Sequence, residues 1–211
     1  MRRSILLSKM TDSPPAVPGG WQGGTTGAQA GKRERLIAAA AETIYAAGVE
    51  KTTLADIAAA AGIPLGNVYY YFKTKDALVQ AVVEAHLAEA RTMLAAIDNA
   101  HQTPRERLKA LFGALAQQSD LIARYGCPQG SLCSELDKRA EGPSFATAEL
   151  LQVPIQWAEE QFRAIGRRDA RSLALDLLAA YEGSALLTNT LRDPNVLVMT
   201  ERRLENWIDS L

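Results

Sequence analysis

The sequence predicts an all-α protein. From residue 32 to the C-terminus, alanine and leucine recur at helical spacing, and no segment shows the period-two alternation of a half-buried strand. The chain has 211 residues, of which 47% are hydrophobic, so a sizeable core can form without disulfides or structural metals. Its two cysteines and two histidines lack the spacing of a metal site. We therefore expect a helical protein that needs neither metal nor cofactor.

Composition divides the chain into three segments. Residues 1–31 include a stretch rich in glycine and proline and are expected to form a flexible arm. Residues 32–78 are expected to form one small helical domain, and residues 79–211 a second, larger one. Residues 1–78 carry nine basic and six acidic side chains, against fourteen and eighteen in residues 79–211. This asymmetry is small enough to arise by chance on solvated helix faces.

No apolar run approaches the roughly 20 residues that cross a bilayer. The apolar stretch after Arg3 is only Ile5 to Leu7, too short for the centre of a secretory signal. We therefore expect no contact with a membrane, a cytoplasmic location and reduced cysteines.

Capping and breaking residues set the boundaries of the first four helices. The first helix is expected at about 32–47, because Gly48 supplies a stop just beyond its last turn. A short helix follows Thr53, which caps free amides together with Asp56, and ends by Gly62. Pro64 suits the first turn of a third short helix. After Thr74, a long helix is expected to reach about residue 100.

Thr103-Pro104 and the later glycine and proline breaks divide the remaining sequence. We expect further helices at about 104–124, 131–140, 145–165, 169–191 and 194–210, which gives about nine in total. No internal repeat is present.

Residues 53–76 have the spacing of a helix-turn-helix motif. The turn contains Gly62, which tolerates a positive φ at low cost. The residues expected to pack the two short helices against each other are Ile57, Ala60, Ile63 and Val68. The second short helix has few charges and carries four consecutive aromatic residues, which cannot all point inward because neighbours in a helix do not share a face.

The pattern of residues 32–80 resembles the DNA-binding domain of the TetR family of bacterial transcriptional regulators. The residues that carry the resemblance are Thr53, Ile57, Ala58, Ala61, Gly62, Ile63, Tyr69, Tyr71, Phe72 and Lys75. One departure is Asn67, where the family more often has threonine or serine. Asparagine can also bond a base edge or a phosphate, so the departure affects operator sequence rather than function.

The resemblance implies a DNA-binding surface. Leu65 and Asn67 would face base edges in the major groove, and Tyr69 would lie between base contact and core. The expected phosphate contacts, which set affinity and register rather than sequence choice, are Tyr70, Tyr71, Thr52 or Thr53, and Lys75. Lys32, Arg33 and Arg35 could add phosphate or minor-groove contacts. Two alternatives are that Phe72 and Tyr69 are core aromatics and that the basic residues are simply a solvated helix start.

The resemblance also implies a ligand-binding and dimerisation function for residues 79–211. A single motif makes too few base contacts for useful specificity, so a dimer on a palindromic duplex is expected. The expected dimer helices are the last two, through Leu173, Leu177, Ala180, Tyr181, Ser184, Leu187, Val196, Met199, Leu204, Trp207, Ile208 and Leu211. These same residues also suit the core of one subunit.

A cavity for a small apolar or aromatic ligand is expected between the motif and the dimer helices. Its candidate lining is Leu111, Phe112, Leu115, Leu121, Trp157, Phe162 and Tyr181. Each of these is also a typical core residue.

Cys127 and Cys133 lie in a loop that enters a helix. A helix start favours thiolate and lowers the thiol pKa, so one function to consider is sensing of oxidants or electrophiles. The alternative is that both are small buried hydrophobic residues.

Enzymatic function has no specific support, since the chain has no nucleophile elbow, phosphate-binding loop or metal motif. An architectural DNA-binding protein without a ligand is a second alternative. The sequence favours a dimeric, ligand-responsive transcriptional regulator, with the repressor role taken from what is common in the family.

Overall fold

The computed structural model describes residues 31–138 and 147–211. Over these residues the chain is α-helical, as the sequence predicts, and contains no strand. The predicted arm lies, apart from Gly31, outside the described residues. The helices are α1 (Lys32–Ala47), α2 (Leu54–Ala61), α3 (Leu65–Tyr71), α4 (Lys75–Ala100), α5 (Pro104–Ala116), α6 (Ser119–Tyr125), α7 (Pro128–Asp137), α8 (Thr147–Ala164), α9 (Ala170–Leu191) and α10 (Asn195–Ser210).

The segment expected as one helix at 104–124 is two helices, α5 and α6. Gln118 leaves helical geometry, with φ −96° and ψ 11°. No glycine or proline marks this break, so the sequence carries no local signal for it. Helix α7 also begins earlier than expected, because Cys127 is its N-cap and Pro128 occupies the first turn, where a missing amide N–H costs little.

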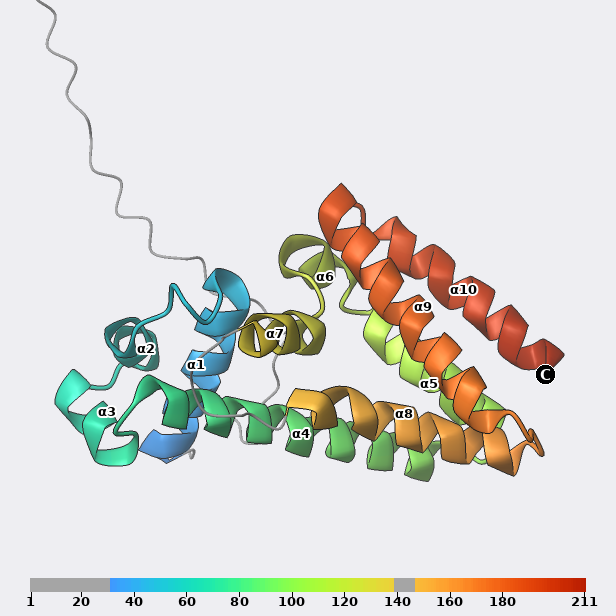
Figure 1. Cartoon of the computed structure of the whole chain (residues 1–211), viewed down its shortest axis with the longest axis horizontal. Coiled ribbons are helices and arrows are strands. Elements are labelled where there is room, and N and C mark those ends of the chain that lie inside the picture. Colours follow the sequence, from blue (N-terminus) through green and yellow to red (C-terminus); the bar gives the residue numbers. More distant parts are fainter. Residues whose placement is uncertain (1–30, 139–146) are drawn as a thin grey trace, which may run out of the picture.

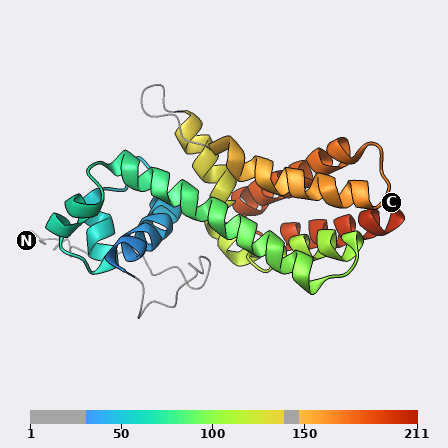
Figure 2. The same cartoon turned by 90° about the horizontal axis from the view of Figure 1, so that it is seen from below.

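The helices form two lobes joined by α4 (Figures 1 and 2). Helices α1 to α3 and the start of α4 form one end of the molecule, and α5, α8, α9 and α10 form the other. Helix α4 has 26 residues and spans about 39 Å. The backbone shows no break at residue 78, where composition placed the boundary between domains.

Each lobe has its own buried apolar cluster. The first combines residues of α1 to α4, such as Leu36, Val68 and Leu78, with Leu132 of α7 and Leu150 of α8. The second lies among the remaining helices, and includes the fully buried side chains of Leu108, Phe162 and Leu177. Because α4 contributes to both clusters, the two lobes share one rigid element.

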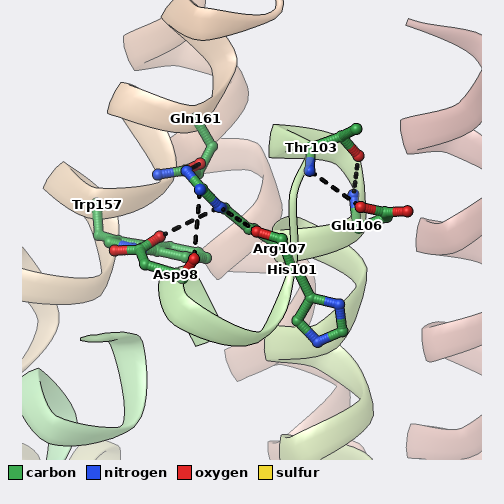
Figure 3. Close-up of polar contacts among 7 residues, drawn as sticks. All are labelled: Asp98, His101, Thr103, Glu106, Arg107, Trp157 and Gln161. Atoms are coloured by element: carbon green, nitrogen blue, oxygen red, sulfur yellow. Dashed lines mark hydrogen bonds and ion pairs between the residues drawn. The ribbon is translucent and has the colours of Figure 1, made fainter. Parts of the chain in front are cut away.

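A partly buried polar network fixes the far end of α4 (Figure 3). The indole N–H of Trp157 on α8 donates to both carboxylate oxygens of Asp98, at 3.2 and 3.1 Å. Arg107 of α5 donates to the His101 and Asp98 carbonyls and to the Gln161 side chain. Its Nε lies 3.6 Å from the Asp98 carboxylate. The network therefore joins α4, α5 and α8 through Asp98.

We expect Asp98→Ala to lower the free energy of unfolding by about 1–3 kcal/mol, because it leaves the Trp157 N–H without its acceptor. Asp98→Asn keeps an acceptor oxygen and should cost less. Urea denaturation of the two variants measures both effects. Equal losses would show that the negative charge, rather than the acceptor, is what the network requires.

Candidate DNA-binding interface

Helix α2 begins with the capping box that the sequence predicts. The Thr53 side chain accepts from the Asp56 amide at 3.2 Å, and the Asp56 carboxylate accepts from the Thr53 amide at 2.9 Å. The Thr53 hydroxyl also donates to that carboxylate at 2.6 Å. These bonds satisfy two of the free amides at the helix start, so α2 has a fixed beginning despite its length of only eight residues.

The turn between α2 and α3 is fixed by backbone bonds and by an arginine. Gly62 has φ 62° and ψ 38°, the left-handed conformation that favours glycine. The Ile63 and Gly62 amides donate to the Ala58 and Ala59 carbonyls, as in a Schellman motif. Arg35 of α1 donates to the Ala61 carbonyl at 2.6 Å. Arg35, one of three basic residues that could add a contact with DNA, thus bonds the backbone of the turn.

The packing of α2 on α3 is largely the one expected. Ile57, Ile63 and Val68 are buried, while Ala60 is exposed and does not pack between the helices. Ala58, rather than Ala60, is the buried alanine of α2. The motif is thus held by a small apolar contact that leaves the opposite face of α3 open.

Helix α3 lies at one end of the molecule (Figure 1), and its seven residues include no charged side chain. Leu65 is 39% exposed, Tyr69 48% and Tyr70 77%, whereas Val68 and Phe72 are buried. Phe72 is therefore a core residue, and Tyr69 is not. A Cβ added to Gly66, on the same face, would meet nothing within 4 Å. Large apolar side chains held in solvent at a helix surface are typical of a contact with another molecule.

Asn67 and Tyr71 are half-buried beside this face. Tyr71 packs against the first core cluster and meets the Tyr70 ring edge-on at 5.0 Å between centroids. Tyr71 therefore supports Tyr70 as well as being a candidate phosphate contact.

The predicted phosphate contacts divide into exposed and buried groups. Lys32 and Arg33 are exposed, and the Arg33 guanidinium lies 5.3 Å from the centre of the Phe72 ring. Lys75 is half-buried and donates to the Glu50 carbonyl at 3.3 Å. Of the two alternatives Thr52 and Thr53, Thr52 is 2% exposed and its hydroxyl donates to the Gly48 carbonyl, so its side chain is not available to a phosphate. Thr53 is exposed, but the capping box uses its hydroxyl.

Comparison with known proteins identifies this arrangement. A sequence model of bacterial regulatory proteins of the tetR family matches residues 36–82, which span α1 to the start of α4. An uncharacterised helix-turn-helix regulator of Mycobacterium tuberculosis H37Rv is 31% identical over 190 residues, which cover 84% of this chain and 94% of that protein. The chain belongs to the TetR family. The regulator TtgR of Pseudomonas putida is 44% identical over 189 residues, covering 84% of this chain and 88% of its own.

Solved structures show the same fold. A TetR transcriptional regulator of Legionella pneumophila has a TM-score of 0.74 at 23% identity, and the match covers 86% of this chain and 97% of that one. The reduced form of Escherichia coli NemR has a TM-score of 0.70 at 21% identity, covering 83% and 96%. The family model and the regulators of Mycobacterium tuberculosis and Pseudomonas putida, rather than these structures, show that this chain is a DNA-binding transcriptional regulator and not an enzyme. None of the described helices is long and apolar enough to span a membrane.

Half of the residues expected at the dimer interface of this TetR-family regulator are buried within the single subunit. Among them, Leu173, Leu177, Ser184, Leu204 and Ile208 each expose 9% or less of their surface. Tyr181 is buried as well, and the remaining predicted residues are half-buried, apart from Leu187 and Met199, which are exposed.

The exposed apolar surface lies on the neighbouring face of the same two helices. Its members are Leu175, Leu186, Leu187, Leu191 and Met199, between 44% and 67% exposed. Sequence reasoning found Leu187 and Met199 but missed the others, because α9 is apolar on more than one face. Helical spacing alone could not show which face packs on α8 and α10.

Most of the residues expected to line a ligand cavity are brought together in the buried core of the second lobe. Leu111, Phe112, Trp157, Phe162 and Tyr181 are buried in the second core cluster, and Leu115 packs against it. Phe112 meets Tyr181 edge-on at 6.3 Å between ring centroids. Leu121 is half-buried at the start of α6. Among the described residues, a cavity lies at a different place, where α1 meets α6, α7 and α9.

The lowered thiol pKa values expected for a redox sensor do not occur. Cys127 is buried at the N-cap of α7, where its sulfur accepts from the Gly130 amide. Burial, together with the charge of Glu182 at 3.3 Å, nevertheless raises its pKa to about 12. Burial also raises the pKa of Cys133 to about 11. Both thiols stay protonated near neutral pH, so the second interpretation, small buried hydrophobic residues, fits them better.

The capping box makes stability depend on pH. Hydrogen bonds from the Thr53 side chain and amide lower the pKa of Asp56 below its usual value. A carboxyl whose pKa is lowered by folding stabilises above its unfolded pKa, and that contribution disappears as the pH falls through the folded value. We expect Asp56→Asn to be less stable than wild type at neutral pH and equally stable in strong acid, as measured by denaturant unfolding. In a Thr53→Ala background the pH dependence of this difference should shrink.

Proposed function

We propose that this TetR-family regulator is a homodimeric repressor that binds a palindromic operator in the cytoplasm and leaves it when a small-molecule inducer binds. Members of the family bind operator DNA and generally act as dimers. The observation that carries the proposal is the exposed, uncharged face of α3, formed by Leu65, Gly66, Tyr69 and Tyr70. The major groove of B-DNA admits a helix of this kind.

The groups around α3 support a DNA contact. Lys32 and Arg33 flank it from α1, and Lys75 begins the helix that follows it. Cationic side chains beside a recognition helix neutralise phosphates and release counterions, so they add affinity for any duplex. Tyr70 is 77% exposed and can reach a phosphate with its hydroxyl. Apolar contact from Leu65 and hydrogen bonding from Asn67 would supply the choice of sequence.

The exposed face of α9 and α10 supports a dimer. Leu175, Leu186, Leu187 and Leu191 recur on one side of α9, and Met199 lies on α10. Gly183 is on the exposed side, where an added Cβ would meet nothing within 4 Å, so a partner helix can approach closely. Two such helix pairs would bury these side chains in a four-helix interface and place two copies of α3 for a palindromic site.

Selection of bound duplexes from a random pool, with purified protein at two salt concentrations, tests the proposal. We expect an inverted repeat whose half-sites are separated by about one helical turn. Retention that is independent of sequence and sensitive to salt would instead indicate an architectural DNA-binding protein. Loss of all retention would contradict DNA binding altogether.

A charged variant of the proposed interface provides the control. Leu186→Glu should leave the subunit folded but shift it to monomer in analytical ultracentrifugation, and the selected motif should lose its repeat. Gln152→Glu, at an exposed site on α8, adds the same charge and should change neither result.

Substitutions at Asn67 and Lys75 should have different effects. Lys75→Ala should weaken binding to all duplexes about equally and lower the salt slope by about 1, as expected of a phosphate contact. Asn67→Ala should cost about 1–3 kcal/mol on the selected site and broaden the sequence preference. Fluorescence anisotropy with the selected site and a scrambled duplex measures both. Identical behaviour of the two variants would contradict the roles given to these residues.

A further inference from the structure

A cavity of about 300 Å³ lies where the DNA-binding lobe meets the second lobe. It is formed by the last turns of α1, by α6 and α7, by the C-terminal end of α9 and by His86 of α4. This volume is at the lower end of the range of small-molecule sites. None of the residues that line the cavity belongs to the buried cluster of the second lobe. None of the residues predicted to line a ligand cavity lines it either.

The charged groups around the cavity leave an excess of positive charge. Arg124 and Arg192 line it, against one carboxylate, that of Glu135. The Glu135 carboxylate accepts from the Val49 amide at 2.6 Å, and neither guanidinium forms an ion pair with a carboxylate of a described residue. Burial lowers the pKa of His86, so its imidazole is neutral near pH 7 and adds no charge.

Both guanidinium groups line the cavity and keep N–H donors that no described residue accepts from. Arg192 uses one nitrogen, Nη1, to donate to the Ala123 and Arg124 carbonyls at 2.9 and 2.6 Å. An arginine has five N–H donors, so its other nitrogens remain available for a bidentate contact. The Arg124 guanidinium lies 5.2 Å from the centre of the Tyr125 ring, and among the described residues no carboxylate or carbonyl accepts a hydrogen bond from it.

Apolar groups form part of the remaining wall. Ile44 of α1 and Leu132 of α7 are buried there, with Pro128 and the Tyr45 and Tyr125 rings, while the side chains of Ser131 and Asn189 add polar groups. The two tyrosine rings lie 5.3 Å apart between centroids, tilted by 56°. A ligand that suits this lining has one negative group for the two guanidinium groups and a flat ring that can pack on Tyr125 and Pro128.

We propose that this junction cavity binds a small organic anion, an aromatic carboxylate whose charged group is held by Arg124 and Arg192. Charge-assisted bonds from two guanidinium groups would orient the carboxylate, and the aromatic body would pack on Tyr125 and the apolar wall. The effect of this ligand on transcription rests on the proposed function, whereas its binding does not.

The position of the cavity couples it to the DNA-binding lobe. On one side, Glu135 of α7 holds the Val49 amide, just after α1. On the other, the Tyr45 hydroxyl donates to the Gly126 carbonyl at 2.7 Å, which joins α1 to the loop between α6 and α7. A ligand between these two bonds touches both lobes, so its affinity depends on how the two lobes are positioned relative to each other. By linkage, ligand and operator then change each other's affinity by the same factor.

Calorimetric titration of the full chain with 2-naphthoate and with its neutral analogue 2-naphthamide tests the proposal. We expect saturable binding of 2-naphthoate and at least tenfold weaker binding of the amide, since the amide lacks the charge. Arg124→Gln should weaken 2-naphthoate binding about tenfold or more and leave the amide unchanged. The matched control is Arg168→Gln, which removes an exposed arginine between α8 and α9 and should bind like wild type. Circular dichroism checks that both variants are folded.

Three results would overturn the proposal. These are no saturable binding of 2-naphthoate at millimolar concentration, equal affinity for acid and amide, or the same affinity in the Arg124→Gln and Arg168→Gln proteins. Operator binding is measured separately with the selected duplex. If an operator is selected but 2-naphthoate does not bind, the ligand site is contradicted and the proposed function is not. If 2-naphthoate binds but no operator is selected, the proposed function is contradicted and the ligand site is supported.

Discussion

The structure depends on one constraint, the continuity of α4. Its 26 residues contribute to the buried clusters of both lobes, with Leu78 and Val82 in the first and Leu94 and Ile97 in the second. A helix that is packed in two cores cannot move in one without disturbing the other, because protein interiors are close-packed. The face of α3 that supports DNA binding is therefore positioned by contacts made at a distance from it.

Polar contacts join the helices at the far end of α4 and at the junction between the lobes. At the far end of α4, the Asp98 carboxylate accepts from the Trp157 indole of α8 and pairs with Arg107 of α5. These contacts fix the helix in the second lobe. At the junction, single bonds from Glu135 and Tyr45 connect α1 to α7 and to the α6–α7 loop. A few hydrogen bonds around a cavity are easier to rearrange than a filled apolar core. Leu132 of α7 and Leu150 of α8 also pack in the first buried cluster, so the junction combines apolar packing with these hydrogen bonds, and a change there would alter the position of the DNA-binding lobe.

Burial repeatedly reverses what a local rule predicts. A cysteine at a helix start should favour thiolate, yet desolvation and Glu182 keep the Cys127 thiol protonated. Thr52, adjacent to the capping residue, should be available to a phosphate, yet it lies inside the lobe and bonds the Gly48 carbonyl. In both cases the distant part of the chain that covers the residue decides its chemistry, and nothing in the neighbouring sequence identifies that part.

The sequence by itself determined the fold class, most helix boundaries, the helix-turn-helix and the family, because capping residues, glycine turns and apolar spacing act over a few positions. It also determined that the aromatic residues of α3 must divide between core and surface. Only the tertiary structure decided which side each one takes, that Arg35 holds the turn, and which face of α9 remains exposed. It alone placed Arg124 and Arg192 beside Tyr45 and Glu135 in one cavity. These outcomes depend on how helices far apart in sequence pack together, and periodicity within one helix carries no information about its neighbours.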